Sequence, residues 1–432
     1  MSNVKKSPKG SSSKGFSYVK SSGGIKEFCL NKNGLKVLIK EDHSLPVATV
    51  MVTYHVGSRN EAVGHTGSTH ILEHMMFKKT KNYPANYTDI FTNEGGRENA
   101  TTWMDRTNYF EILPIDMLSK ALAYEADRMR NLAFTEEDLK KEMVVVRNEY
   151  ERGENSSEEA LDKAIWASAF QAHPYHHSTI GWLSDIENVT ASRLYDFYNT
   201  YYWPNNATLT VIGDVSTNKL LELIKKSFGR ISASPKSIPQ MLVKEPAQEG
   251  VRKVVVSRSE EAGIVGIAQK VPNGLHQDIY PLAILAGILV SGKSSRLYKK
   301  LVETNLATKV SVMGFPFRDP SLFTIYSKLS GKSGHEVILD SIINEIKYIK
   351  DNGVNKDEIK NAITKNIAQA VFARDGSYNT ASNINEAIAT GDWTLFTNFV
   401  HQISSVTAED VIRVAKLYFN ERERTIGFFI PK

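Results

Sequence analysis

The alternation of apolar and polar residues predicts a series of strands and helices. Residues 34–40 alternate toward their end and residues 47–56 are rich in β-branched side chains, so both segments are predicted to be strands. Residues 97–112 contain enough Thr, Trp, Tyr and Phe for two short strands, and residues 208–212 are predicted to form a buried strand. Helices are predicted over residues 87–94, 116–131, 135–152, 158–172 and 190–202.

The second half of the chain repeats the pattern of the first. Residues 187–212 contain Glu-Asn-Val-Thr-Ala, a helix, Tyr-Tyr and then the strand Thr-Leu-Thr-Val-Ile. Residues 404–429 contain Ser-Ser-Val-Thr-Ala, a helix, Tyr-Phe and then Thr-Ile-Gly-Phe-Phe, 217 residues later. Duplication is the simplest explanation. We therefore predict an α+β fold of two α/β-sandwich domains, each a mostly antiparallel sheet with helices packed on one face.

Composition divides the chain further. Residues 1–24 are rich in Ser and Lys and are predicted to be a disordered basic tail. Residues 25–231 are predicted to form the N-terminal domain, and residues 249–432 the second domain. Residues 232–248, with three prolines and little periodicity, are predicted to link them.

Charge and composition exclude several classes of function. The formal charge of +5 is mild, and no Lys/Arg patch with interleaved aromatics occurs outside the tail, so nucleic-acid binding is not expected. No run of 18 apolar residues exists, so no membrane span is expected. Cys29 is the one cysteine, which rules out an intramolecular disulfide. The sequence is compatible with the cytoplasm, and with the periplasm or export if a signal peptide was removed.

The segment His70-Ile-Leu-Glu-His74 is the strongest chemical signal. On a helix, at about 100° per residue, positions 70, 73 and 74 fall within one third of the circumference. Two imidazoles at i and i+4 can bind one metal ion, and Glu73 between them can reach a water molecule at that ion. The spacing H-x-x-E-H is that of inverzincins. The alternative is that these side chains share a helix by chance, in a chain with 11 histidines.

A protease-type zinc site needs a third protein ligand. In the helix predicted over residues 135–152, Glu142 and Glu149 lie within about 90° of the centre of the apolar stripe, whereas Glu151 and Glu137 lie further away. Only the first pair can face inward, although a solvated helix surface is the ordinary alternative. The stripe consists of Leu139, Met143, Val146 and Tyr150.

Two other segments bear on metal binding. The histidines of His173-Pro-Tyr-His-His177 can bind metal, but Pro174 breaks helical spacing and hydrogen-bonding roles are expected. In the repeat, positions 70, 73 and 74 correspond to Gly287, Val290 and Ser291. The second domain therefore has no metal chemistry at the matching helix, and we expect it to serve as a wall, a clamp or an assembly surface.

Further motifs accompany the metal motif. They are the trailing Met-Met-Phe-x-x-Thr, Gly95-Gly-x-x-Asn-Ala-x-Thr-x-x-Asp-x-Thr-x-Tyr109, Glu142-x-x-Val-Val-x-x-Glu149, Pro204-Asn-Asn-Ala and Gly213-Asp214-Val. With them, roughly residues 25–430 resemble the pitrilysin family of zinc metallopeptidases. The resemblance is to its short subunits with a single motif, which include the β subunit of the mitochondrial processing peptidase and bacterial zinc proteases.

The resemblance implies a zinc-dependent endopeptidase that acts on peptides or unstructured protein segments. It implies that His70, His74 and Glu149 bind one Zn²⁺ per chain, and that Glu73 is the general base. Glu142 matches a family glutamate that supports catalysis.

The resemblance also concerns the substrate and the partners. Asn99 and Ala100 match the strand edge on which the family lays an extended peptide substrate. The family uses an Arg and a Tyr to hold substrate, and around residues 320–328 no clear matching pair occurs. We therefore expect another subunit to supply them, in a homodimer or in a heterodimer with a paralogue that lacks the motif.

Two alternatives stay open at this point. One is a catalytically idle scaffold or assembly subunit, like the family's members in respiratory complexes, although those typically have an eroded motif. The other is a structural zinc protein, which needs a fourth ligand that the sequence does not show.

Overall fold

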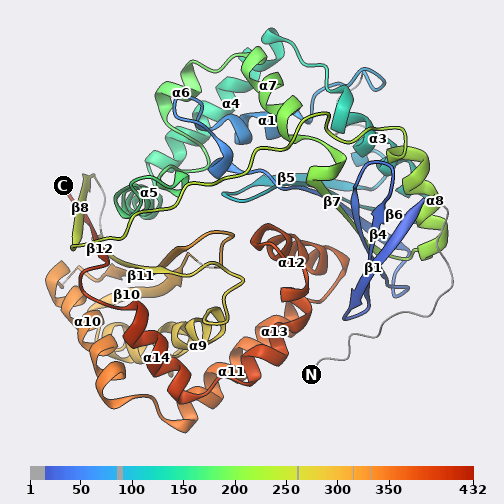
Figure 1. The fold of residues 1–432 in the computed structure, drawn as a ribbon. Coiled ribbons are helices and arrows are strands. Elements are labelled where there is room, and N and C mark those ends of the chain that lie inside the picture. Colours follow the sequence, from blue (N-terminus) through green and yellow to red (C-terminus); the bar gives the residue numbers. More distant parts are fainter. Residues whose placement is uncertain (1–14, 85–90, 260–261, 315, 332) are drawn as a thin grey trace. The chain divides into compact units, whose positions relative to one another are not determined.

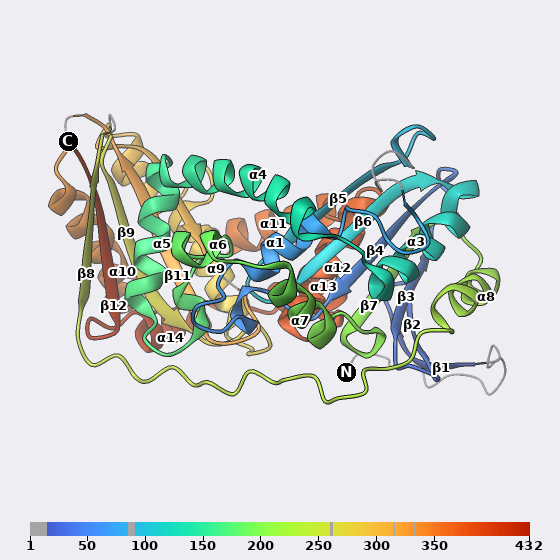
Figure 2. The same ribbon diagram turned by 90° about the horizontal axis from the view of Figure 1, so that it is seen from above.

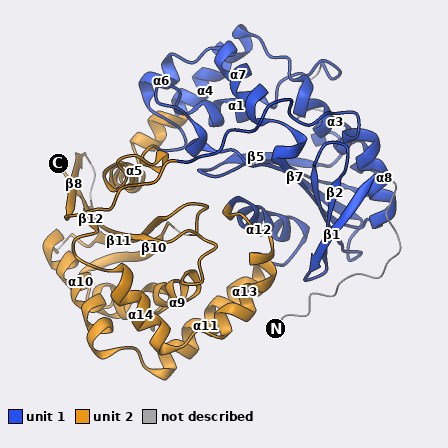
Figure 3. Ribbon diagram, in the orientation of Figure 1, with its two compact units in different colours: residues 1–148, 178–242, 374–389 blue, residues 149–177, 243–373, 390–432 orange. Residues whose placement is uncertain are grey.

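The computed structural model describes residues 15–84, 91–259, 262–314, 316–331 and 333–432. The chain forms two compact units, coloured separately in Figure 3. Unit 1 comprises residues 1–148, 178–242 and 374–389, and unit 2 comprises residues 149–177, 243–373 and 390–432. Each unit contains one sheet and the helices that cover it, so each is described by itself.

Unit 1 is built on a seven-stranded sheet with the order β1-β2-β3-β7-β4-β6-β5 (Figures 1 and 2). Neighbouring strands are antiparallel except β3 and β7, which run parallel. β7 lies inside the sheet and all seven of its residues are buried. The strands are β1 (Phe16–Ser22), β2 (Ile25–Leu30), β3 (Lys36–Glu41), β4 (Val47–Tyr54), β5 (Arg97–Thr102), β6 (Thr107–Pro114) and β7 (Ala207–Gly213).

The prediction of a disordered tail over residues 1–24 is wrong for residues 16–24. Strand β1 pairs with β2, and Phe16 at its start is only 3% exposed. Gly23 and Gly24 have φ values of 56° and 81°, which let the chain turn back without the strain of a side chain. The Ser-rich composition of these residues does not predict a strand, because the strand is stabilised by pairing with β2 and not by its own residues. Residues 1–14 lie outside the described residues.

One face of the unit 1 sheet is covered by helices from the first half of the chain. Tyr54 on β4 packs against Tyr202 at the end of α7, with ring centroids 4.3 Å apart, and α3 contacts β4 and β6. The helices of this unit from the first half are α1 (Ser68–Met75), α3 (Leu118–Asn131), α4 (Glu136–Glu154), α6 (Leu183–Glu187), α7 (Ala191–Tyr201) and α8 (Thr217–Phe228).

The other face of this sheet is covered by α12 (Ser377–Thr390), which comes from the second half of the chain. Thr49 and Thr53 on β4 point away from Tyr54 because side chains alternate along a strand. Their hydroxyls donate to Ser377 Oγ at 2.8 Å and to Asn385 Oδ1 at 2.7 Å. These contacts place residues 374–389 in unit 1, outside the predicted boundaries of the N-terminal domain.

Unit 2 contains a five-stranded sheet with the order β10-β11-β9-β12-β8, in which only the β12–β8 pair is parallel. Its strands are β8 (Arg252–Arg258), β9 (Ile264–Val271), β10 (Ala307–Met313), β11 (Ser321–Leu329) and β12 (Arg424–Pro431). Its helices are α5 (Ser157–Ala169), α9 (Ile279–Val290), α10 (His335–Asn352), α11 (Lys356–Phe372), α13 (Thr394–Ser404) and α14 (Ala408–Tyr418).

Helix α5 is the counterpart of α12, because it joins unit 2 from the first half of the chain. Ile165 on α5 packs directly on Gly266 of β9 and Gly427 of β12, where any Cβ would overlap its side chain. The two glycines therefore let the helix approach the sheet closely. This packing places residues 149–177 in unit 2, whereas the prediction assigned them to the N-terminal domain.

The other sequence predictions concern the fold class, the linker, one helix and membrane spans. The fold class is confirmed, with two mostly antiparallel sheets and their helices. Residues 232–248 contain no helix or strand. The first half of the helix predicted over residues 87–94 lies outside the described residues, and of the second half residues 91 and 92 are helical. In the described part of the chain, no helix combines the length and apolarity that a membrane crossing requires.

Candidate metal centre

Helix α1 carries the metal motif, and its start is held by a buried carboxylate. Glu61 accepts hydrogen bonds from the backbone N–H groups of Gly67 at 2.9 Å and Thr69 at 2.7 Å. These are amides that an α-helix leaves unpaired at its N-terminus. Burial raises the pKa of Glu61 to about 8, and the two amides oppose this rise. Gly67 has a φ of 84°, and a Cβ there would overlap the carbonyl of Ile180.

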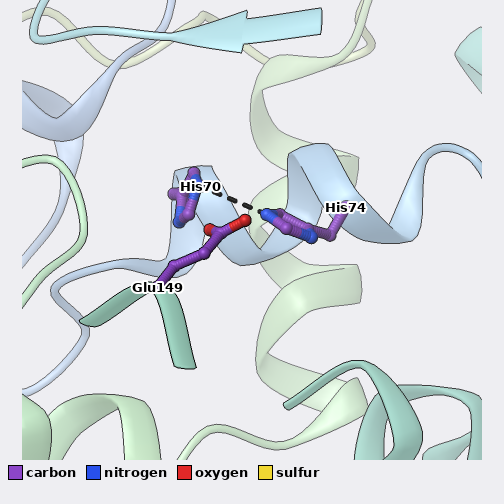
Figure 4. A group of neighbouring side chains, drawn as sticks. All are labelled: His70, His74 and Glu149. Carbon is purple, nitrogen blue, oxygen red and sulfur yellow. Dashed lines mark hydrogen bonds between the residues drawn. The ribbon is translucent and has the colours of Figure 1, made fainter. Parts of the chain in front are cut away.

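His70 and His74 face each other on α1. Their Nε2 atoms lie 3.3 Å apart and their ring centroids 4.7 Å apart (Figure 4). Burial, with a smaller contribution from His74, lowers the pKa of His70 to about 4. His70 is therefore neutral at pH 7, as a metal-binding imidazole must be.

Glu142 on α4 fixes the orientation of the His74 ring. Its Oε1 lies 2.9 Å from Nδ1 of His74, and its Oε2 accepts from the Lys78 ammonium at 2.5 Å. The hydrogen bond from His74, assisted by Lys78, lowers the pKa of Glu142 to about 2 despite partial burial. An ionised carboxylate here selects the tautomer with the proton on Nδ1, so the lone pair of His74 is on Nε2, toward His70.

Glu149 lies two turns beyond Glu142 on the same helix. One of its oxygens and one nitrogen of each histidine lie within 4.8 Å of one another (Figure 4). The division into units falls between Asn148 and Glu149, inside the unbroken α4, so the backbone of Glu149 is held by the helix that carries Glu142.

The three side chains fit a zinc ion. Two ligands of a tetrahedral zinc at about 2.0–2.1 Å lie roughly 3.3 Å apart, which matches the separation of the two Nε2 atoms. Two imidazoles and a carboxylate are also the donor types of catalytic zinc, and they leave one coordination position for water or substrate.

The histidines at residues 173–177 do not gather into such a group in the described structure. His173 Nε2 lies 3.3 Å from Asp319 Oδ2, and its Nδ1 accepts from the backbone N–H of Tyr175. His176 Nδ1 lies 3.0 Å from the carbonyl oxygen of His173. These are hydrogen-bonding roles.

Glu73 lies between the two histidines in the sequence of α1, and its carboxylate contacts β5. It is 9% exposed, and its Oε2 accepts a hydrogen bond from Thr102 Oγ1 at 2.5 Å. The carboxylate is therefore held against β5 by the helix that also carries both histidines.

Asn99 and Ala100 lie on β5, the outermost strand of the unit 1 sheet. Asn99 is exposed and Ala100 is 6% exposed, and Asn99 Oδ1 accepts from the N–H of Ala100 at 2.8 Å. β5 pairs with β6 on one side only among the described strands. β5 is therefore an edge strand of this sheet among the described strands.

Sequence reasoning missed three residues of the centre: Glu61, Lys78 and Thr102. Thr102 belongs to the Asn-Ala-x-Thr motif, so its position was visible but its contact with Glu73 was not. Lys78 follows His74 by four residues, beyond the end of α1, and Glu61 lies in the preceding loop. No sequence pattern reveals which side chains such loop residues contact.

Comparison with known proteins agrees with this geometry. Residues 36–181 match the profile described as "Insulinase (Peptidase family M16)", and residues 188–366 match "Peptidase M16 inactive domain". The chain is 32% identical over 409 residues to "Zinc protease PqqE" of Helicobacter pylori, covering 93% of this chain and 91% of that protein. It is 24% identical to a probable mitochondrial-processing peptidase subunit beta of Arabidopsis thaliana, covering 92% and 77%.

Solved structures give the same result. The crystal structure of a protease from Helicobacter pylori superposes with a TM-score of 0.91 at 31% identity, covering 95% of this chain and all of that one. The identity and coverage are high enough to establish the relationship. The chain therefore belongs to the insulinase or pitrilysin family, peptidase family M16.

Proposed function

We propose that this protein is a zinc-dependent endopeptidase that hydrolyses peptides or unstructured protein segments. The observation that carries the proposal is the convergence of His70, His74 and Glu149, with ligand atoms within 4.8 Å of one another. The names of the M16 relatives, which include zinc proteases, support it. One zinc ion per chain would be held by these three residues.

The chain's own residues account for the proton transfers. Zinc in this centre would supply Lewis acidity toward a water molecule and the scissile carbonyl. Glu73 accepts a proton from the attacking water and delivers it to the leaving amine, so that water adds across the peptide bond. Glu142 holds the Nδ1 proton of His74 and so keeps Nε2 available to the metal.

The substrate would bind as an extended strand on the outer edge of β5. Backbone N–H and C=O groups at that edge, around Asn99 and Ala100, provide hydrogen bonds that do not depend on side chains. This mode requires the substrate to be extended, which favours peptides and unstructured segments over folded proteins.

Replacing Glu73 with Gln tests the proposal. Glu73→Gln removes the general base and keeps the side-chain shape, so zinc content should be unchanged while the hydrolysis of a quenched peptide falls about 10²- to 10⁴-fold. Glu137→Gln is the matched control, because Glu137 lies at the start of α4 with a side chain 76% exposed and paired with Lys141. Full activity in zinc-loaded Glu73→Gln would show that Glu73 is not the general base.

An idle scaffold of the same fold is the second candidate. The match of residues 188–366 to an inactive domain favours it for the second half of the chain. It predicts no hydrolysis by the wild-type protein even when zinc measured by elemental analysis is stoichiometric. The quenched-peptide assay on zinc-loaded wild type therefore separates the two candidates.

We also propose that the active form is a dimer, either with a second copy or with a paralogue that lacks the motif. The Arg and Tyr that hold substrate elsewhere in the family have no clear match around residues 320–328, so a second subunit would supply them. Light scattering of the purified protein and mass measurement of co-purified chains test this. A monomer with full activity would contradict it.

A further inference from the structure

Thr102 ends strand β5 directly beside the proposed general base. Its hydroxyl donates to Glu73 Oε2 at 2.5 Å, a length typical of a strong hydrogen bond to a carboxylate. Glu73 is 9% exposed, so water competes little for this bond. The side chain of a Glu has three rotatable bonds, and in a helix of eight residues the backbone alone does not fix its carboxylate. The hydroxyl of Thr102 supplies a fixed point.

The strand that carries Thr102 is itself held from its other face. Arg106 Nη1 donates to the carbonyl of Thr101 at 2.9 Å, and Thr101 Oγ1 donates to Asn108 Oδ1 at 2.6 Å. Arg106 also forms an ion pair with Glu386 on α12 at 2.6 Å, with the arginine side chain 10% exposed. Within unit 1, these bonds hold β5, β6 and α12 together. The hydroxyl of Thr102 therefore projects from a rigid support.

We propose that Thr102 is a positioning residue that fixes the carboxylate of Glu73 for proton transfer. Among the described residues, the Thr102 hydroxyl is hydrogen-bonded to Glu73 and to none of His70, His74 and Glu149, so it acts through Glu73. The inference rests on the proposed function, because it assumes that Glu73 is the base. A displacement of about 1 Å from the reactive geometry can lower a rate by about 10²-fold, so an unanchored base should be slow but not absent.

The test compares two substitutions at this position. Thr102→Val keeps the shape and the preference for a strand but has no hydroxyl, whereas Thr102→Ser keeps the hydroxyl. We expect kcat to fall about 10- to 100-fold in Thr102→Val with KM and zinc content near wild type. We expect Thr102→Ser to recover most of kcat. A residue needed only for folding would not show this rescue, and would lower the melting temperature in parallel.

A binding measurement gives a second readout that does not depend on turnover. A peptide hydroxamate binds a zinc centre and shares a proton with the neighbouring carboxylate. Its affinity should therefore weaken in Thr102→Val and recover in Thr102→Ser. The matched control is Thr308→Val on β10, the outermost strand of the unit 2 sheet, where the exposed Thr308 bonds only the carbonyl of Lys328 among its described partners. It should change neither kcat nor hydroxamate affinity.

Failure of this inference and failure of the proposed function give different results. If Thr102→Val equals wild type while Glu73→Gln is inert, the positioning role is overturned and the proposed function stands. The role is also overturned if Thr102→Ser is as slow as Thr102→Val, or if Thr102→Val loses its zinc. If Glu73→Gln is fully active, the proposed function fails. If the role is correct, the double variant Glu73→Gln with Thr102→Val is no slower than Glu73→Gln alone.

Discussion

Units 1 and 2 share an arrangement of five strands, to which unit 1 adds β1 and β2, but they differ in the side chains that lie beside it. In unit 1 the order β3-β7-β4-β6-β5 ends in the edge strand that contacts α1, the helix of the candidate metal centre, and in unit 2 the order β8-β12-β9-β11-β10 repeats it. Each sheet receives one covering helix from the other half of the chain, α12 or α5. The framework therefore does not depend on the metal site.

The difference lies in a few side chains. At the repeat spacing, His70 corresponds to Gly287, and Glu149 corresponds to Asn366 on α11. A Cβ at Gly287 would lie 3.2 Å from the Cβ of Ala362 and 3.3 Å from Nδ2 of Asn366, so α9 and α11 pack closely. Ser291, the counterpart of His74, lies just beyond the end of α9.

Unit 2 has an apolar cavity next to this contact. Its volume is about 530 Å³, and it is bordered by α9, β10, α11 and α13. Its apolar lining includes Ile279, Ala283, Val290, Val312, Leu395 and Phe399. Unit 2 therefore has an apolar cavity beside α9, whereas unit 1 has the candidate metal ligands His70 and His74 on the corresponding helix α1.

The largest effect is expected when a ligand is removed. His74→Ala should reduce zinc from one per chain to near zero and hydrolysis to background, because two remaining ligands hold zinc poorly. The matched change in unit 2, Ser291→Ala, should leave zinc content and hydrolysis at wild-type values. Elemental analysis and the peptide assay check both. If zinc stays at one per chain in His74→Ala, then His74 is not a ligand and the proposed difference between the two units is contradicted.

A smaller effect is expected at Glu142. Glu142→Ala removes the acceptor for His74 Nδ1, so zinc affinity should weaken about 10- to 100-fold. The counterpart at the repeat spacing is Ile359, which packs against the core of unit 2. Ile359→Ala should lower stability and leave zinc affinity unchanged, as measured by competition with a chelator. Equal zinc affinities in the two variants would contradict the role of Glu142.

The smallest effect concerns the contact that replaces the metal centre. Gly287→Val should lower the free energy of unfolding by about 1–3 kcal/mol, since its side chain would crowd Ala362 and Asn366. Gly250→Ala is the control, because a Cβ there meets nothing within 4 Å. Urea unfolding measures both. Zinc content should stay at wild type, and an unchanged midpoint for Gly287→Val would show that α9 and α11 can separate at little cost.

Sequence patterns predicted most of the local structure. Strands such as β4 and β7 and the helix that became α4 carry periodicities that arise from burial on one or two faces. The helix-face argument predicted that Glu142 and Glu149 face inward. The structure brings both to the histidines, with Glu142 half-buried and Glu149 exposed. Local periodicity is sufficient for such residues because their direction follows from the helix itself.

Contacts between distant segments could not be predicted in this way. The hydroxyl of Thr102 reaches Glu73 across 29 residues, and Thr53 meets Asn385 across 332. The extent of unit 1 depends on such contacts. Composition and a linker alone therefore did not predict that residues 374–389 belong to it. The β1–β2 hairpin could not be predicted either. The polar composition of β1 favours disorder, and its hydrogen bonds to β2 stabilise the strand instead.

The origin of α12 has a consequence for the order in which the protein matures. Thr49 and Thr53 are synthesised early, but their partners Ser377 and Asn385 leave the ribosome only after some 330 further residues. Until then, the face of the unit 1 sheet that α12 later covers is exposed to solvent. The ion pair between Arg106 and Glu386 is also not yet formed. The covering of this face of the sheet is thereby coupled to translation of the chain at least as far as Asn385.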